Sequence, residues 1–356
     1  MEIAPFELER WFDEYEHDAE IMLAESGIRS LPAARFDTDP GELGYVIPTD
    51  GAPEFRATVG ERYDRSAAEV CFTCGTQEAN YLVFRSLLDP GDHVVVVTPT
   101  YQALSAVPES ICAISRVELS PPDWELDLDA IREAIEPETR LIVLNNPNNP
   151  TGKHHSENTV RALYDLAAEN DAYLLCDEVY RLLADDPLPP VASMGERGIT
   201  TTSLTKAYGL AGLRFGWIAG PEAVVEGAVR WKDYTTISPS IFGQHVAKQA
   251  LGEQEEEILE ENRRLAREHR DIVEGWIDEQ GLSWHEPVGV NGFVSVPEAF
   301  DSGEAFCRAV VGEESVVLAP GEFFGFEEYF RIGFGLETEA LTEGLDRVGR
   351  VIERHG

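Results

Sequence analysis

Lysine is nearly missing from this chain. Only four of its 28 basic residues are lysines, and one of these, Lys206, lies in the glycine-rich run from Ser203 to Gly216. Arginine stays charged and is a poor nucleophile, whereas a lysine amine can lose its proton and attack an aldehyde. A lysine kept at this place therefore predicts a Schiff base rather than the exposed position that most lysines occupy.

Positive charge as a whole is also scarce. The 28 basic and 66 acidic side chains give a net charge of −38, which argues against binding to nucleic acid or to an anionic membrane surface. A coat of carboxylates with few lysines is typical of proteins in a high-salt cytoplasm, where salt screens the self-repulsion. We therefore expect a halophilic protein.

Long hydrophobic runs and paired cysteines are absent from the sequence. No stretch of about 18 apolar residues occurs, and the first residues lack a basic start followed by an apolar core. We therefore expect a cytoplasmic protein without a membrane span or signal peptide. The pair Cys71 and Cys74 has no second pair to complete a zinc site, so we interpret the five scattered cysteines as structural thiols and expect no metal.

The neighbours of Lys206 suit an anion. Ser203 offers a hydroxyl, Arg214 offers a guanidinium, and the glycines between Gly209 and Gly216 let the backbone come close to a bound group. Pyridoxal phosphate requires both features: an amine that forms an imine with its aldehyde, and neighbouring groups that bind its phosphate.

Two further segments supply what that cofactor needs. An apolar strand runs into Asp177, whose carboxylate can keep a pyridine nitrogen protonated, and Tyr180 follows three residues later as a donor for the phenolate oxygen. Two Asn-Pro steps end another strand and leave Asn149 able to meet the same oxygen.

With these residues the chain resembles fold-type I pyridoxal-phosphate enzymes of the class I/II aminotransferase family, from about residue 45 to about residue 335. The motifs are Asn149-Pro150-Thr151-Gly152, Asp177-x-x-Tyr180, and Ser203-x-x-Lys206 with Arg214. The resemblance implies that Lys206 binds the cofactor, that Asp177 pairs with its pyridine nitrogen, that Asn149 and Tyr180 bond its phenolate oxygen, and that Ser203 and Arg214 hold its phosphate.

The same resemblance extends to three further places in the cofactor and substrate site. Gly75, Thr76 and Gln77 match the phosphate loop, where a strand turns into a helix whose first amides face the anion. Tyr101 matches the aromatic residue that stacks on the cofactor ring. Arg331, a charge in an alternating apolar strand, matches the arginine that binds the substrate α-carboxylate, with Asn149 beside it.

Tyr45 matches a tyrosine that reaches the cofactor phosphate of the other subunit, which implies a homodimer with shared active sites. The N-terminal pattern is also similar to a subgroup that contains capreomycidine synthase. A dicarboxylic substrate would need a second cation, for which Arg230 or Lys232 is a candidate, although we expect both to be surface residues.

Short β-rich runs alternate with helical segments in the middle of the chain. The expected strands are 70–73, 94–97, 114–119, 141–144, 173–176, 200–203 and 215–219. Helical connections such as residues 157–169 predict an α/β fold with a mostly parallel seven-stranded sheet. We expect this sheet in a large domain, residues 45–252, and a smaller α+β domain built from residues 1–44 and 253–356.

Three functions remain open. The first is an aminotransferase that moves an amino group between an amino acid and a 2-oxo acid. The second is a lyase or replacement enzyme that loses a β or γ group after the same first steps. The third is a non-catalytic ligand-binding protein, which would not need the lysine and aspartate that are intact here.

Overall fold

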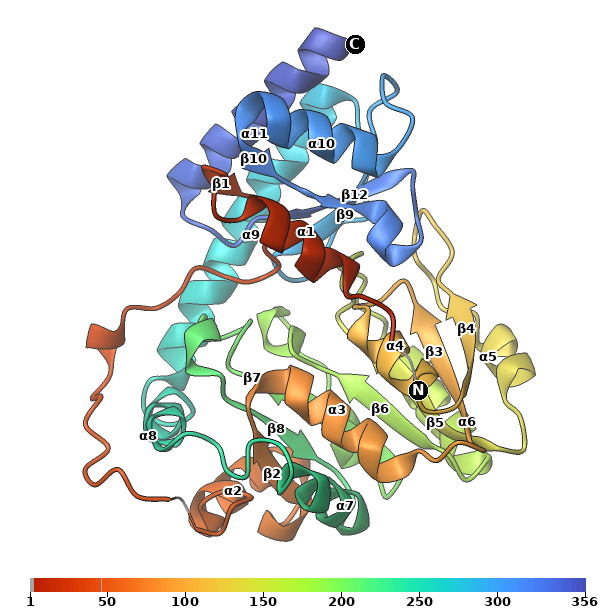
Figure 1. The fold of residues 1–356 in the computed structure, drawn as a ribbon, viewed down its shortest axis with the longest axis vertical. Helices are drawn as coiled ribbons and strands as arrows, with labels where there is room; N and C mark the ends of the chain where they lie inside the picture. Colours follow the sequence, from red (N-terminus) through yellow and green to blue (C-terminus); the bar gives the residue numbers. More distant parts are fainter. Residues whose placement is uncertain (1–2, 46) are drawn as a thin grey trace.

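A seven-stranded sheet forms the centre of the computed structural model, which describes residues 3–45 and 47–356 (Figure 1). Its spatial order is β2 (Val70–Thr73), β8 (Gly216–Ala219), β7 (Gly198–Ser203), β6 (Tyr173–Asp177), β5 (Thr139–Asn145), β3 (His93–Thr98) and β4 (Ala113–Glu118). Strand β8 runs antiparallel to β2 and β7, and the other neighbours are parallel. The expected α/β fold with a mostly parallel seven-stranded sheet is confirmed.

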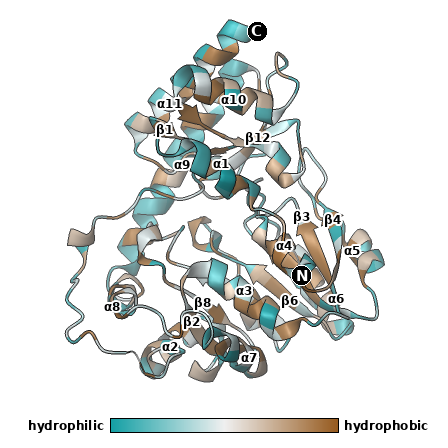
Figure 2. Cartoon of the chain, viewed as in Figure 1, coloured by the Kyte–Doolittle hydropathy of each residue, from teal (hydrophilic) through white to brown (hydrophobic). Residues whose placement is uncertain are grey.

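Helices cover both faces of this sheet, which explains why strands such as β3 and β6 are apolar along most of their length (Figure 2). In β3, Val94 and Val96 pack into one cluster with residues of α3 (Gly75–Leu87) and α7 (Glu222–Lys232). Val95 and Val97 point to the opposite face and belong to a second cluster, which includes residues of α6 (Glu157–Glu169). The alternation of side chains along each strand thus builds two cores from one apolar run.

The shorter helices begin where local side chains or turns permit. Asp127 accepts hydrogen bonds from two amides at the start of α5 (Leu128–Ala134), and Ser156 accepts from Thr159 at the start of α6. Pro53 opens α2 (Pro53–Gly60), where a missing amide hydrogen does no harm. Helices α4 (Ala103–Glu109) and α8 (Ile241–Ala250) complete the layers around the sheet.

A second group of elements lies above the main sheet in Figure 1. Strands β11 (Ala319–Pro320), β12 (Tyr329–Gly333) and β9 (Asn291–Ser295) form an antiparallel sheet, with α10 (Gly303–Glu314) and α11 (Thr338–His355) packed nearby. The long helix α9 (Glu255–Gln280) leads from α8 into this group.

The N-terminal segment contacts both groups of elements. Strand β1 (Ile21–Met22) pairs in parallel with β10 (Val316–Val317). Helix α1 (Glu7–Tyr15) is anchored by the Trp11 Nε1 hydrogen bond to the Leu318 oxygen at 2.8 Å. At its other end, the Gln102 side chain accepts from the Glu7 amide at 2.9 Å and donates to the Pro5 oxygen at 2.7 Å. Helix α1 therefore spans the opening between the two groups.

Candidate active site

A cavity of about 330 Å³ lies where the parallel strands end, between the main sheet and α1. Ten of the twelve residues expected at the site line it: Thr76, Gln77, Tyr101, Asn149, Asp177, Tyr180, Ser203, Lys206, Arg214 and Arg331. They follow β2, β3, β5, β6 and β7 or lie in β12, far apart in the sequence. The carboxyl edge of an α/β sheet is the usual place for a ligand, because loops from several strands meet there.

One end of the cavity is built to receive an anion. Gly75, the first residue of α3, has a φ of +77°, and a Cβ at this position would lie 2.8 Å from Nη2 of Arg214. The buried Thr76 Oγ1 has no hydrogen-bond partner among the described residues. An unpartnered hydroxyl, a guanidinium and the amino end of a helix together fit a phosphate group.

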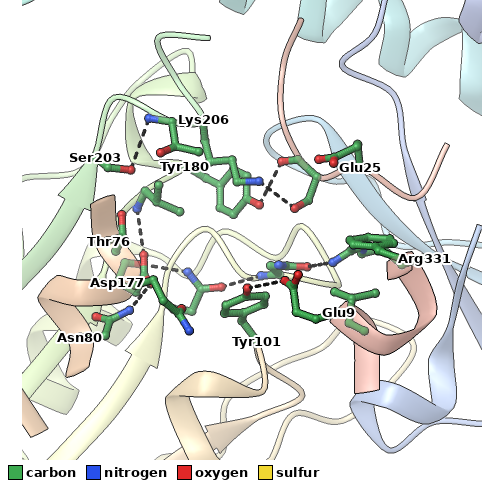
Figure 3. A pocket seen from close by; sticks show the side chains of 18 of the residues that line it. Glu9, Glu25, Thr76, Asn80, Tyr101, Asp177, Tyr180, Ser203, Lys206 and Arg331 are labelled. Atoms are coloured by element: carbon green, nitrogen blue, oxygen red, sulfur yellow. Dashed lines mark hydrogen bonds between the residues drawn. The ribbon is translucent and has the colours of Figure 1, made fainter. Parts of the chain in front are cut away.

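Lys206 extends into the middle of the cavity (Figure 3). Its Nζ donates to Ser26 Oγ at 3.0 Å, and the Tyr180 hydroxyl donates to the Ser26 main-chain oxygen at the same distance. Ser26 is buried and holds both side chains from the N-terminal segment. Ser26 thus holds the amine at one place in the cavity.

Asp177 lies at the end of β6, with a side chain that is almost completely buried. Burial raises the pKa of Asp177 to about 6, because water no longer stabilises the charged form. Hydrogen bonds from Asn80 at 2.8 Å and from the Val179 amide at 3.2 Å, together with the nearby charge of Lys206, oppose this rise of the pKa. The carboxylate therefore has donors that favour its ionised form.

Arg331 is almost fully buried in β12 and points into the cavity, as its lone charge in an apolar strand predicts. Its Nη1 donates to Asn149 Oδ1 at 3.1 Å and its Nη2 to the Ala24 oxygen at 2.5 Å. Its Nε has no partner among the described residues. Burial lowers the pKa of Arg331, and the nearby Tyr180 and Glu25 act in the opposite direction.

Tyr101 forms a wall of the cavity next to α1. Its ring lies 5.0 Å from that of Phe6, and its hydroxyl is 3.4 Å from Glu9 Oε1. Burial raises the pKa of Tyr101, so the hydroxyl stays protonated. The flat ring, partly buried beside Asn149 and Arg331 on the cavity lining, is suited to stacking against another planar group.

Two expected site residues lie off the cavity lining. Gly75 is adjacent to it, as its approach to Arg214 demonstrates. Tyr45 is 80% exposed and belongs to an extended segment at the edge of the molecule (Figure 1). The described single chain therefore brings Tyr45 to none of the other site residues.

The expectation that Lys232 is a surface residue was wrong. Lys232 is only 1% exposed, and its Nζ donates to the Thr49 oxygen at 2.6 Å and to the Ile237 oxygen at 3.0 Å. Two main-chain oxygens replace the water around the ammonium group, which allows its burial. Arg230 is exposed, as expected, and neither residue lines the cavity.

Some residues of the site were not predicted from the sequence. Asn80 could have been found, because it lies four positions after Thr76 and so shares its helix face. No local signal points to Ser26, which meets Lys206 across 180 residues of chain. Glu9 and Glu25 also line the cavity, and nothing in the charge pattern separates them from the many other acidic residues.

The fold and the cavity define a class of enzymes that carry pyridoxal phosphate on a lysine. A model of the family "Aminotransferase class I and II" matches residues 14–348, and the chain belongs to this family.

Relatives agree with this assignment. The chain is 31% identical to capreomycidine synthase of Streptomyces vinaceus over 98% of this chain and 94% of the relative. It is 29% identical to aromatic-amino-acid aminotransferase 2 of Thermococcus litoralis, over 87% and 85% of the two chains. A solved pyridoxal-phosphate-dependent aminotransferase from Streptococcus suis matches with 33% identity and a TM-score of 0.94, covering 100% of this chain and 99% of that one.

Proposed function

We propose that this aminotransferase moves an amino group between an amino acid and a 2-oxo acid, with pyridoxal phosphate held covalently on Lys206. The observation that carries the proposal is that Lys206, Asp177 and Arg331 line one cavity. When bound, the cofactor supplies an electron sink for the pair of electrons left on the substrate α-carbon. The protein positions both molecules and moves protons.

In this proposal, one part of the cavity binds the ring of the cofactor and another part binds its phosphate. Asp177 holds a proton on the pyridine nitrogen, and Tyr101 stacks against the ring. Asn149 would donate to the phenolate oxygen through its amide group, and the Tyr180 hydroxyl would turn its one hydrogen from the Ser26 oxygen to the same phenolate. The phosphate is held by Gly75, Thr76, Gln77, Ser203 and Arg214, where the orphaned Thr76 hydroxyl supports the assignment.

Lys206 has a second task as an acid and base. As a free amine, its Nζ would act as the base that removes the proton from the substrate α-carbon and as the acid that gives a proton back. The Ser26 hydroxyl, 3.0 Å from Nζ, holds the amine at one place in the cavity. Tyr180 bonds the same serine, so both side chains keep a fixed orientation.

Arg331 selects the substrate. A buried guanidinium with a free Nε and a neighbouring Nη can hold an α-carboxylate through two parallel hydrogen bonds. Asn149 is bonded to the same guanidinium, which links substrate binding to the cofactor. An α-amino acid satisfies these contacts with its carboxylate while its amine meets the cofactor.

The active form is proposed to be a homodimer in which Tyr45 reaches the partner's cofactor phosphate. Large apolar side chains are exposed on two segments of the described chain, which supports a covered surface there: Leu43, Tyr45, Ile47, Tyr234, Ile237 and Phe242. We propose residues 45–252 as the large domain, and residues 1–44 with 253–356 as the small one. Light scattering of the purified protein tests the dimer, and a monomer with full activity would contradict it.

The location of the protein is part of the proposal as well. Within residues 3–45 and 47–356, no helix has the length and hydrophobicity that crossing a membrane requires. The net charge of −38 supports a high-salt cytoplasm as the working environment. The melting temperature should therefore rise as KCl is raised from dilute to molar concentrations, and a constant or falling value would contradict this assignment.

A panel of amino donors tested against 2-oxoglutarate examines the main proposal. We expect a 2-oxo acid to form in step with glutamate for at least one donor. Without an acceptor, one equivalent of 2-oxo acid should appear together with the aminated cofactor. A loaded enzyme that produced neither product with any donor would contradict transamination.

A second candidate is suggested by the similarity to capreomycidine synthase, which covers nearly the whole chain. In this alternative the enzyme loses or replaces a β or γ group of the amino acid after removing the same α-proton. Continuous turnover of a β- or γ-substituted amino acid without any acceptor would identify it. The third possibility, a non-catalytic binding protein, is disfavoured because Lys206 and Asp177 share the cavity.

A further inference from the structure

Asn80 and Thr201 meet Asp177 from two different elements. Asn80 lies in α3 and is 2% exposed, while Thr201 lies in β7 and is fully buried. Thr201 pairs with Asp177 across neighbouring strands β7 and β6, so the register of the sheet sets the two residues side by side. Asn80 bridges them from α3, and its side chain lies beside that of Asp177 in Figure 3.

The direction of these hydrogen bonds follows from the chemistry of the groups. Asn80 Nδ2 lies 2.8 Å from Asp177 Oδ2, and Asn80 Oδ1 lies 2.6 Å from the Thr201 hydroxyl. An ionised carboxylate can only accept, so the NH₂ group of the amide must face Asp177. The amide oxygen then faces Thr201, whose hydroxyl must donate. Thr201 therefore fixes which end of Asn80 meets the carboxylate.

The second oxygen of Asp177 is held independently. Its Oδ1 accepts from the Val179 amide at 3.2 Å, in the turn after β6. With one donor on each oxygen, from α3 and from this turn, the carboxylate cannot rotate without breaking a buried hydrogen bond.

We propose that Asn80 and Thr201 act as positioning residues that hold Asp177 ionised and turned toward the pyridine nitrogen of the cofactor. The inference rests on the proposed function, because Asp177 has this task only in an enzyme that carries pyridoxal phosphate. Burial disfavours the negative charge of Asp177. The next residue along the chain, Glu178, is a second buried carboxyl group. The charge of Lys206 and the donors from Asn80 and Val179 act against burial. Of the two donors, Asn80 is the one that donates through its side chain. Its replacement therefore removes a hydrogen bond to the charged carboxylate of Asp177.

The test uses four variants of the loaded enzyme. Asn80→Leu removes the donor at nearly constant size. Thr201→Val leaves the amide free to turn, and Thr201→Ser restores the hydroxyl. Thr139→Val is the matched control, because Thr139 is a buried threonine of the same sheet whose hydroxyl bonds His93 and Glu136 at the opposite end of β5. Two quantities are measured: kcat per bound cofactor, and the nitrogen chemical shift of ¹⁵N-labelled pyridoxal phosphate bound to the protein.

We expect Asn80→Leu to bind the cofactor but to lose about ten- to a hundredfold in kcat, as the loss of a hydrogen bond to a charged group implies. The nitrogen shift should move toward that of the unprotonated ring. Thr201→Val should show the same changes to a smaller degree, Thr201→Ser should resemble the wild type, and Thr139→Val should lower only the melting temperature.

A merely structural role predicts a different outcome. Asn80→Leu and Thr201→Val would then lose stability, while kcat per bound cofactor and the nitrogen shift stayed at the wild-type values, and this result would overturn the proposal. If Asn80→Leu does not fold, the comparison of Thr201→Val with Thr201→Ser decides in the same way. Failure of the proposed function would instead be seen in the wild-type protein, which would show no cofactor signal or no transamination.

Discussion

Replacing Arg331 with lysine is the most informative single substitution in the substrate site. Lysine keeps the positive charge but replaces a planar fork with a single ammonium group. In the structure the guanidinium already donates to Asn149 Oδ1 and to the Ala24 oxygen, and its Nε is free. One ammonium group cannot reach both protein acceptors and also hold a carboxylate through two parallel bonds.

The size of the effect follows from one lost hydrogen bond to a charged group. Such a bond contributes about 1.5–3 kcal/mol, which corresponds to about a ten- to two-hundredfold loss in kcat/KM for the amino acid. The melting temperature should also fall somewhat, because Ala24 or Asn149 loses a donor. Cofactor affinity should change much less than kcat/KM, since the anion cradle around Gly75 and Arg214 lies at the other end of the cavity.

The assay measures kcat/KM, cofactor affinity and melting temperature on one preparation. Arg65→Lys is the matched control, because Arg65 is also buried and bonds the Ala192 and Gly195 oxygens away from the cavity. The control should lower the melting temperature and leave kcat/KM for the amino acid unchanged. If Arg331→Lys behaves like the control, Arg331 does not bind the substrate.

Two further predictions address the cofactor site. In the cofactor-free protein, the pKa of Asp177 is raised from 3.8 to about 6, so the folded state binds the proton more tightly than the unfolded state does. The wild type should therefore lose about 3 kcal/mol of unfolding free energy relative to Asp177→Asn as the pH rises from about 3 to about 7. Parallel pH profiles in chemical denaturation would contradict this. Gly75→Ala adds a Cβ at a φ of +77° and 2.8 Å from Arg214 Nη2, and the left-handed backbone alone costs about 1–2 kcal/mol. The added Cβ also displaces the Arg214 guanidinium from the cradle, and the loss of a hydrogen bond to a charged group, about 1.5–3 kcal/mol, lowers cofactor affinity by about ten- to two-hundredfold. Gly312→Ala in α10 has nothing within 4 Å of the added Cβ and should leave cofactor affinity unchanged. Equal affinities in the two variants would exclude the cradle.

Much of the fold is predictable from local patterns. The strand β3 carries four valines in a row, Val94 to Val97, because helices cover both faces of the sheet, and this run ends where polar residues begin. The site residues follow these strands directly, so the order of strands and motifs already indicates one common edge. Arg331 is predictable for a related reason, since a lone charge in a buried strand requires an anion.

The residues that were missed or misjudged depend on contacts between distant parts of the chain. Lys232 was expected at the surface because most lysines are exposed, but the Thr49 oxygen, 183 residues away, receives its ammonium group. Ser26 reaches Lys206 only because the N-terminal segment folds back over the sheet. The pairing of Thr201 with Asp177 depends on the register between β6 and β7, which no local pattern specifies.

Reduction of the loaded protein with borohydride tests the central claim most directly, because it turns the bond between Lys206 and the cofactor into a permanent one. Mass spectrometry of a digest should then find the pyridoxyl group on the peptide that contains Lys206. Lys206→Ala should carry no adduct and should not turn over, although Arg214 and the amino end of α3 can still hold the phosphate. A pyridoxyl group on Lys153, Lys232 or Lys248, or a covalent adduct retained by Lys206→Ala, would contradict the account.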